Sequence, residues 1–360
     1  MFVDRFSNLE EQLQLVLSAI VVQPGKDGEI MIAAQVIARI LLNIPQPSPT
    51  PQKIAASSMG DFSITTNPSQ GNGHVTSPQK FSPSIIKNPD SVAHLRPPKL
   101  FSFVSQLSGH TVYGLVFPPP EHMENQKRPT MLYVYGGPGI QLVNIEYKTG
   151  RYFRLALAAY YGIPAVIVDC RGSARRGRVW ENHISQQMGQ VEVADHVEGL
   201  EAAAERFPFI DINRVAVHGW SYGGYLSLMA LAQRPDRFKI AISGAPTTDW
   251  RLYDTAWTER YMGMPTSNNQ TNGGFSPYQL GSVLQLANHF PDDPDRLWIV
   301  HGLLDENVHF AHTAALLDAI NRAGKPYRLF VYPNELHGLR QPENYAHCCA
   351  LLLYALLNFL

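Results

Sequence analysis

Residues 214–235 run from an apolar strand through a single serine into a helix, with no loop between the two elements. The strand is RVAVHGW, the serine lies in HGWSYGGY, and the helix follows at once as YLSLMALAQRP. A serine on so sharp a bend is either a tight turn residue or a nucleophile. The junction therefore constrains both the fold and the chemistry of this chain.

The same alternation of strands and helices extends over residues 100–360. A β-hairpin is expected over residues 100–119, with its turn at SGH. Apolar strands are predicted at 131–137, 165–169, 214–220, 239–245, 297–302 and 327–333. Helices are predicted at 151–162, 191–207, 225–235, 312–324 and 344–360. This order predicts an α/β fold in which helices cover both faces of a mostly parallel sheet.

The first hundred residues have a different character. Residues 44–99 are rich in Pro, Ser, Asn and Gly, so we expect a disordered linker that cannot bury enough apolar surface to offset chain entropy. Residues 1–43 hold two apolar runs, LQLVLSAIVV and IMIAAQVIARILLNI, both shorter than the ~20 residues that span a bilayer. The acidic start is not a signal peptide, and we expect no membrane segment.

Charge and cysteine content narrow the function classes. The formal net charge of −1 gives no electrostatic reason to expect nucleic acid as a partner. The three cysteines, two of them adjacent, do not form a disulfide framework, which favours a cytoplasmic protein. The glycosylation triplet at Asn269 is weak counter-evidence, because such triplets arise by chance.

The motif Gly219-Trp220-Ser221-Tyr222-Gly223 fits the pattern G-x-S-x-G between a strand and a helix. Glycines flank the serine because the bend is too tight for neighbouring side chains. The hydroxyl is then presented at the helix N-terminus, where the Tyr222 N–H can stabilise an oxyanion. Taken alone, the motif is as consistent with a turn serine as with a nucleophile.

An acid and a base follow the serine in the order that this architecture requires. Asp305 comes after the strand LWIVHG, and His337 lies in the loop between the strand YRLFVYP and the last helix. A serine nucleophile needs a base, and the base needs an acid to orient it. We therefore predict that Ser221, Asp305 and His337 are the catalytic residues.

Other acidic and histidine residues near the strand ends are alternatives to Asp305 and His337. Glu306 neighbours Asp305 and is an alternative acid, but its side chain is expected to point elsewhere. His218 and His301 lie at strand ends and are interpreted as buried structural histidines, whereas His309 and His312 are assigned to a helix start.

Two clusters suggest ligands of other kinds. His347 stands beside Cys348 and Cys349, but no second ligand pair has suitable spacing, so a helix is favoured over a metal site. The run RGSARRGR is interpreted as a solvated loop with ion pairs, although an anion site is the alternative; its arginines are Arg171, Arg175, Arg176 and Arg178.

From about residue 100 onward the chain resembles the prolyl oligopeptidase family of serine peptidases, in its dipeptidyl peptidase IV branch and especially the cytosolic members. The motifs that carry the resemblance are LYVYGGP, VDCRGS, MGQVEVADHVEGL, HGWSYGGYLSLMAL, YDTAWTERYMG, HGLLDENVHFAHT and RAGKPYRLFVYP. It implies an α/β-hydrolase catalytic domain over residues 100–360, release of X-Pro or X-Ala dipeptides from peptide N-termini, and no cofactor. It also implies peptide substrates with proline at the second position and pairing of hydrolase domains as a homodimer.

The resemblance assigns further roles. Tyr135 is implied to complete the oxyanion hole with the Tyr222 amide, and Asn307 to contact the substrate backbone. Trp250, Tyr253 and Val308 match the walls of a proline pocket. Two positions of this pocket depart from the family pattern, because Trp257 replaces a tyrosine and Thr247 replaces an apolar residue, usually valine.

The family's β-propeller, which supplies two glutamates that bind the substrate's amino terminus, does not fit in this length of chain. The stretch MFVDRFSNLEE, residues 1–11, resembles the tail end of such a propeller, so we expect residues 1–43 to be a propeller remnant or an irregular segment. A fragment, a truncated isoform and an imperfect gene model are the alternatives for the chain as a whole. Two other functions therefore stay open: an esterase or hydrolase of different specificity, and a catalytically impaired partner of a full-length relative.

Overall fold

The computed structural model describes residues 96–144, 149–265 and 275–360. The segment expected over residues 1–43 lies outside the described residues, as does nearly all of the linker expected over residues 44–99. Within the described ranges, no helix combines the length and apolar character that spanning a bilayer requires.

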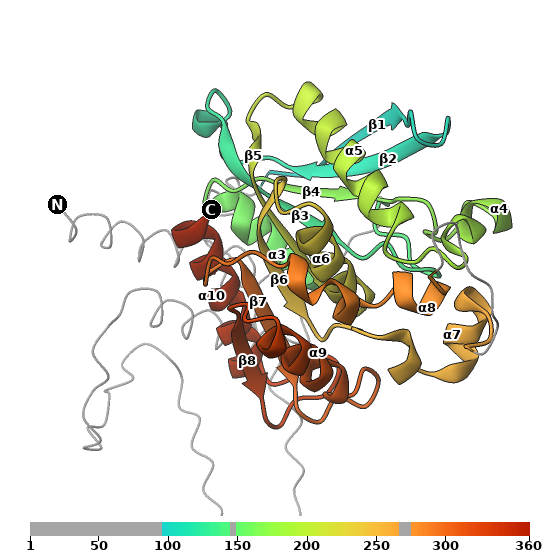
Figure 1. Cartoon of the computed structure of the whole chain (residues 1–360). Coiled ribbons are helices and arrows are strands. Elements are labelled where there is room, and N and C mark those ends of the chain that lie inside the picture. Colours follow the sequence, from blue (N-terminus) through green and yellow to red (C-terminus); the bar gives the residue numbers. More distant parts are fainter. Residues whose placement is uncertain (1–95, 145–148, 266–274) are drawn as a thin grey trace, which may run out of the picture.

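The strands of the described chain form one mixed sheet (Figure 1). Its order is β1-β2-β4-β3-β5-β6-β7-β8, in which β1 and β2 run antiparallel and β3 to β8 are parallel. The strands are β1 (Lys99–Val104), β2 (Thr111–Phe117), β3 (Arg128–Val134), β4 (Ala165–Val168), β5 (Ile210–Trp220), β6 (Phe238–Gly244), β7 (Leu297–Gly302) and β8 (Arg328–Tyr332). The expected hairpin and the mostly parallel sheet are confirmed.

Helices connect the parallel strands, and the carboxyl ends of those strands carry the longer loops. The α-helices are α3 (Thr149–Tyr160), α4 (Arg178–Glu181), α5 (Val191–Arg206), α6 (Tyr222–Gln233), α7 (Thr255–Met262), α8 (Pro277–Leu280), α9 (Ala311–Arg322) and α10 (Pro342–Phe359). Short 3₁₀ helices are η2 (Glu121–Met123), η3 (Asn182–Ile184), η4 (Trp250–Leu252) and η5 (Val283–His289). The five longest helices were predicted, whereas α4, α7, α8 and the 3₁₀ turns were not.

Alternate residues of the central strands face opposite sides of the sheet, because side chains of a strand alternate with a period of two. Leu132 and Val134 of β3 pack with α5, α6 and α9 in one core cluster. Their neighbours Met131 and Tyr133 pack with α3 and α10 in the other. Helices therefore cover both faces, as expected (Figure 1).

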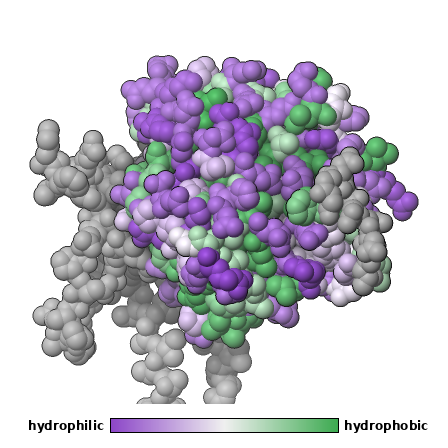
Figure 2. Space-filling model, in the orientation of Figure 1, coloured by the Kyte–Doolittle hydropathy of each residue, from purple (hydrophilic) through white to green (hydrophobic). Residues whose placement is uncertain are grey.

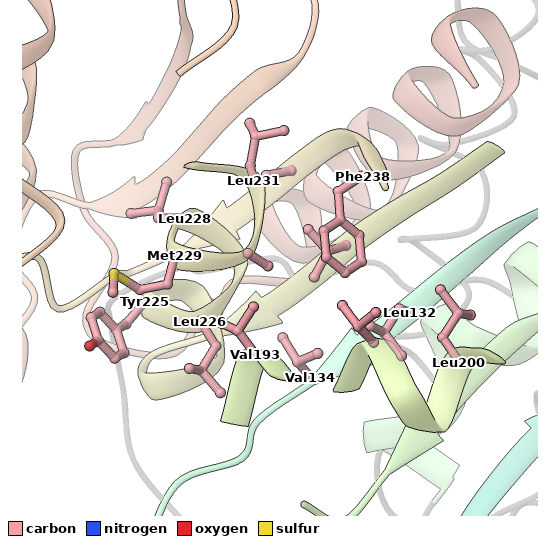
Figure 3. Close-up of a cluster of buried hydrophobic side chains, with 14 of the residues drawn as sticks. Leu132, Val134, Val193, Leu200, Tyr225, Leu226, Leu228, Met229, Leu231 and Phe238 are labelled. Atoms are coloured by element: carbon pink, nitrogen blue, oxygen red, sulfur yellow. The ribbon is translucent and has the colours of Figure 1, made fainter. Parts of the chain in front are cut away.

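Helix α6 lies at the centre of the larger core. Its residues from Tyr222 to Ala232 are all buried, so it is apolar around its whole circumference. Figure 3 shows Leu226, Leu228 and Met229 of α6 packed with side chains from β3, α5 and β6. Because α6 is buried on all sides, its N-terminus is held at a fixed place in the interior. By contrast, the visible surface in Figure 2 is mostly hydrophilic, with apolar residues in scattered groups.

Candidate active site

Ser221 occupies the bend between β5 and α6. Its backbone has φ 63° and ψ −120°, which is a conformation that an L-residue adopts only under strain. The Ser221 N–H donates to Gly244 O at 2.8 Å, and Ser221 O accepts from the Tyr225 N–H at 2.9 Å. The bend is therefore tied to β6 on one side and to the first turn of α6 on the other.

The glycines around the serine are required by close packing of the backbone. A Cβ at Gly219 would lie 2.4 Å from Val134 O, and one at Gly223 would lie 2.1 Å from the same oxygen. A Cβ at Gly224 would lie 2.2 Å from Gly244 O. No side chain fits at these distances, so α6 can approach β3 and β6 only where glycine stands.

Asp305 lies in the loop after β7 and is 5% exposed. Its Oδ2 accepts hydrogen bonds from His337 Nδ1 at 2.8 Å and from His301 Nε2 at 3.0 Å. Its Oδ1 accepts from the N–H groups of Asn307 at 3.0 Å and Val308 at 2.8 Å. Burial raises the pKa of the carboxyl, but the hydrogen bonds from the two histidines outweigh it and hold the pKa well below its ordinary value.

His301 is fully buried at the end of β7. Its Nε2 also lies 2.9 Å from Val308 O, and its Nδ1 lies 2.7 Å from the Thr313 hydroxyl. The carbonyl and the carboxylate are both acceptors, so the proton belongs on Nε2 and the Thr313 hydroxyl donates to Nδ1. The sequence interpretation of a buried structural histidine is confirmed, and its contact with Asp305 is an addition.

His337 lies between β8 and α10 and is held at three points. Its ring Nδ1 donates to Asp305, its N–H donates to Glu306 Oε2 at 2.8 Å, and its carbonyl accepts from Trp220 Nε1 at 2.7 Å. The loop is closed behind it by the buried carboxylate of Glu335, which accepts from the N–H of Arg340 at 2.8 Å. Glu306, the alternative acid, therefore contacts the backbone of His337 and not its ring.

A cavity of about 450 Å³ opens above Ser221. It lies at the carboxyl ends of the parallel strands, where sites of α/β proteins are usually found. Ser221 and His337 both line it, and the other lining residues are Tyr133, Tyr135, Pro138, Leu142, Arg154, Trp220, Tyr222, Thr247, Trp250, Tyr253, Trp257 and Asn307. All the predicted site residues except Asp305 and Val308 therefore meet around one space.

One wall of this cavity is aromatic. The rings of Trp250 and Trp257 are stacked with centroids 5.2 Å apart and an interplanar angle of 23°. The Tyr253 ring meets Trp257 edge-on at 5.3 Å, and its hydroxyl donates to Asn307 Oδ1 at 2.9 Å. Val308 is fully buried and is not among the cavity-lining residues of the described chain. The flat wall suits a rigid, apolar ring.

Tyr135 and Tyr222 form the side of the cavity next to the serine. Tyr222 is the first residue of α6, so its N–H has no acceptor within the helix and can face a ligand. The rings of Tyr135 and Tyr222 lie 6.2 Å apart, and Gly137 leaves room for both. The Tyr222 hydroxyl runs inward and donates to Glu192 Oε1 at 2.5 Å.

Glu192 is completely buried on α5 behind this side of the cavity. Its other oxygen accepts from the Gly189 N–H at 2.9 Å. Burial is the largest influence and raises the pKa of the carboxyl to about 7, although the hydrogen bonds from Tyr222 and Gly189 act in the opposite direction. This carboxyl titrates near neutral pH.

The remaining polar residues weighed from the sequence lie apart from this arrangement or support it structurally. His218 Nδ1 lies 2.8 Å from Ile242 O, and His347 Nδ1 lies 2.8 Å from the Tyr332 hydroxyl. His312 is buried on α9, where its Nδ1 accepts from the Thr248 N–H at 3.2 Å. Within the described ranges, no group of three or more His, Cys, Asp or Glu side chains is arranged to hold a metal ion.

The arginine-rich loop contains an ion pair, as expected. Arg171 makes a two-point contact with the buried carboxylate of Asp195, with Nη2 to Oδ1 at 2.6 Å. The guanidinium of Arg176 stacks over the Trp180 ring at 3.8 Å. Arg175 and Arg178 are exposed.

Sequence reasoning did not select Arg154, Glu192 or Trp220. The position of Trp220 directly before the serine of the motif could have identified it. Arg154 could have been identified as a charged residue in the apolar helix RYFRLALAAYYG. The partner of Glu192 lies 30 residues away on another helix, so no local pattern pointed to it.

A serine on a strand–helix elbow, followed by an acid and a histidine from later loops of a mostly parallel sheet, defines an α/β hydrolase. The model of the prolyl oligopeptidase family matches residues 150–358. The chain belongs to this family.

Individual relatives agree with this assignment. Dipeptidyl peptidase 8 of Homo sapiens is 46% identical over 310 residues, which cover 82% of this chain and 34% of the relative. Probable dipeptidyl-aminopeptidase B of Trichophyton verrucosum is 35% identical over 236 residues, which cover 64% of this chain and 25% of the relative. A putative dipeptidyl aminopeptidase IV from Bacteroides ovatus superposes with a TM-score of 0.66 at 28% identity, covering 73% of this chain and 36% of that one. This chain spans between a quarter and about a third of the length of these relatives.

Proposed function

We propose that this protein is a serine-type dipeptidyl peptidase that releases X-Pro or X-Ala dipeptides through an acyl-enzyme on Ser221. The observation that carries the proposal is the shared cavity of Ser221 and His337, with Asp305 bonded to the far side of the His337 ring. The names of the relatives support the dipeptidyl assignment. Their full length exceeds that of this chain, so the activity is tested on the chain itself.

In the acylation step, His337 Nε2 accepts the proton of the Ser221 hydroxyl while Oγ attacks the scissile carbonyl. Asp305 holds the ring with its proton on Nδ1 and stabilises the imidazolium that forms. The Tyr222 N–H and the Tyr135 hydroxyl would stabilise the charge that develops on the carbonyl oxygen. His337 then gives the proton to the leaving amine, and the C–N bond breaks.

Deacylation repeats these steps with water in place of the serine. His337 takes a proton from the water, whose oxygen attacks the acyl carbon, and returns it to Ser221 as the C–O bond of the ester breaks. The dipeptide leaves with a free carboxylate, and the enzyme regains its starting state. No step of this sequence needs a metal or an organic cofactor.

The aromatic wall of Trp250, Tyr253 and Trp257 supports a preference for proline or alanine next to the scissile bond. Proline is rigid, apolar and without an N–H, so it fits against stacked rings with no unpaired donor. Asn307, which accepts a hydrogen bond from the Tyr253 hydroxyl, would contact the substrate backbone. The larger ring of Trp257 would narrow this part of the cavity, and the hydroxyl of Thr247 would make it more polar. Together they should alter the selectivity between proline and alanine substrates by about 1–3 kcal/mol.

We extend the proposal to a cytoplasmic location and to pairing of hydrolase domains. The three cysteines of the chain are all buried and free, which supports a reducing, cytoplasmic setting. Exposed Tyr354 and Leu357 on α10 offer apolar contact for a second copy of the hydrolase domain.

The proposal is tested by labelling the full chain with a fluorophosphonate probe, with Ser221→Ala as the control. We expect labelling of the wild type that disappears in the variant. Turnover of Ala-Pro-p-nitroanilide and of its N-acetylated form then tests the dipeptidyl assignment, because only a free amino terminus should be accepted. Equal turnover of the two substrates, or a preference for simple esters, would indicate a hydrolase of other specificity. A folded but unlabelled wild type would indicate a catalytically impaired partner.

A further inference from the structure

Arg154 is a half-buried cation on the wall of the catalytic cavity. It lies on α3, and its Nη1 is 3.4 Å from His218 Nε2. Its guanidinium also faces the rings of Trp220 at 5.8 Å and Tyr345 at 5.7 Å. Within the described ranges, no carboxylate lies within ion-pair distance of it, so a group with five donors is left largely unused.

The titratable groups that face Arg154 carry no negative charge at neutral pH. Burial and, after it, the charge of Arg154 lower the pKa of His218 to about 3, so its ring is neutral. Burial raises the pKa of Tyr345 above its ordinary value and that of Cys349 to about 12. Burial likewise raises the pKa of Cys348. Arginine remains protonated in proteins, so among the described residues its positive charge in this part of the cavity is uncompensated.

Most other arginines of the site region are neutralised. Arg171 is paired with Asp195 at 2.6 Å, and Arg251, which adjoins the aromatic wall, is paired with Asp249 at 2.5 Å. Burying a cation without a nearby anion costs free energy, unless a ligand supplies the negative charge. The contrast indicates that Arg154 is available to a substrate.

The position of Arg154 relative to the serine decides which part of the substrate it faces. Under the proposed function, the aromatic wall of Trp250, Tyr253 and Trp257 receives the acyl part of the substrate. His337 protonates the leaving amine, so it marks the leaving-group end of the cavity. Trp220 donates to His337 O, and Arg154 lies against Trp220. Arg154 is therefore on the leaving-group side.

We propose that Arg154 forms a subsite for a carboxylate on the leaving group, so that short peptides with a free carboxyl terminus close to the scissile bond are preferred. This inference rests on the proposed function, because it needs a peptide bond at Ser221. The guanidinium would bind the carboxylate through two N–H groups while its face stays against Trp220 and Tyr345. An aspartate or glutamate side chain just after the scissile bond supplies the same chemistry.

The first experiment compares Ala-Pro-Ala with its carboxyl amide on the full chain, with release of Ala-Pro followed by mass spectrometry. We expect kcat/KM to be about tenfold higher for the acid, which corresponds to one charge-assisted contact of about 1.4 kcal/mol. The preference should shrink as salt is added. Comparing Ala-Pro-Asp-amide with Ala-Pro-Asn-amide shows whether a side-chain carboxylate serves as well as the terminal one.

The variants Arg154→Met and Arg154→Lys isolate the charge. The ratio of acid to amide should fall to about one in Arg154→Met and should be partly kept in Arg154→Lys, where a point charge remains. Arg322→Met is the matched control, because Arg322 is an exposed arginine on α9 and should keep the wild-type ratio. Thermal melting of each variant shows whether the fold is intact.

Binding separates failure of this inference from failure of the proposed function. Calorimetry on Ser221→Ala with the acid and the amide measures the subsite without turnover, and the acid should bind about tenfold more tightly. Equal affinity for the two peptides overturns the inference, even if the wild type hydrolyses Ala-Pro-p-nitroanilide. Tighter binding of the acid without hydrolysis of any substrate would support the subsite and overturn the peptidase.

Discussion

Two buried carboxyl groups are bonded to different residues that line the catalytic cavity, Asp305 to His337 and Glu192 to Tyr222, and they behave differently. Asp305 is 5% exposed and receives four hydrogen bonds, from two histidine rings and two backbone N–H groups. Glu192 is fully buried and receives two, from the Tyr222 hydroxyl and the Gly189 N–H. The pKa of Asp305 is held well below its ordinary value, whereas that of Glu192 is raised to about 7.

The comparison shows that burial alone does not set the charge of a carboxyl group. Burial raises the pKa of both carboxyl groups. The number and type of hydrogen-bond donors decide whether this rise is overcome. Asp305 therefore keeps its negative charge at neutral pH, and under the proposed function it orients His337 there. Glu192 changes its protonation near neutral pH, directly behind the residue whose amide would face the oxyanion.

The largest expected effect comes from removing the charge of Asp305. Asp305→Asn should lower kcat/KM for Ala-Pro-p-nitroanilide by about 10³–10⁴-fold, because an amide no longer holds His337 with its proton on Nδ1. Asp293→Asn, an exposed aspartate before β7, is the control and should retain the wild-type rate. A loss below about tenfold would mean that another group orients His337.

A smaller effect is expected from removing one donor to Asp305. His301→Leu should lower kcat/KM by about 10–100-fold, because a hydrogen bond to a charged group contributes about 1.5–3 kcal/mol. The pKa of Asp305 should rise, so activity should be lost at a higher pH on the acidic side. His301→Gln offers a donor again and should recover part of both changes. If the pH–rate profiles of His301→Leu and His301→Gln both matched that of the wild type, His301 would act only in packing.

The third expected effect concerns Glu192 and appears in the stability of the fold, not in the rate. A folded pKa raised from 4.5 to about 7 means that the stabilisation is complete below pH 4.5 and is lost as pH rises through 7. The loss is roughly 3 kcal/mol at about 1.4 kcal/mol per pKa unit. The melting temperature of the wild type relative to Glu192→Gln should therefore fall by on the order of 5 °C between pH 4.5 and 8. A constant difference would show that Glu192 keeps one protonation state in this range.

Local patterns were sufficient to predict the main elements and to choose three residues that the fold brings together. Strands and helices have different hydrophobic periods, and the acid and base follow strand ends that parallel pairing brings to one edge. Ser221, Asp305 and His337 could therefore be chosen before any coordinates were known. The order of β3 and β4 in the sheet could not, because it depends on which strands pair across long connections.

The contacts that tune the site escaped prediction for a related reason. His301 and Asp305 are four residues apart, yet their bond depends on how the loop after β7 turns back. Arg154 meets Tyr345 only because α3 packs on the same face of the sheet as α10, and Glu192 meets Tyr222 because α5 lies beside α6. Such pairs are set by tertiary packing, which no local period encodes.

The backbone of Ser221 has an evolutionary consequence. Glycine adopts φ 63° freely, whereas a residue with a side chain pays about 1–3 kcal/mol to do so. A lineage selected only for stability would replace this serine with glycine through a one-residue change. Under the proposed function, the hydroxyl group of Ser221 is therefore kept at a cost in stability, and replacing the serine with glycine would exchange the chemistry for a more stable fold.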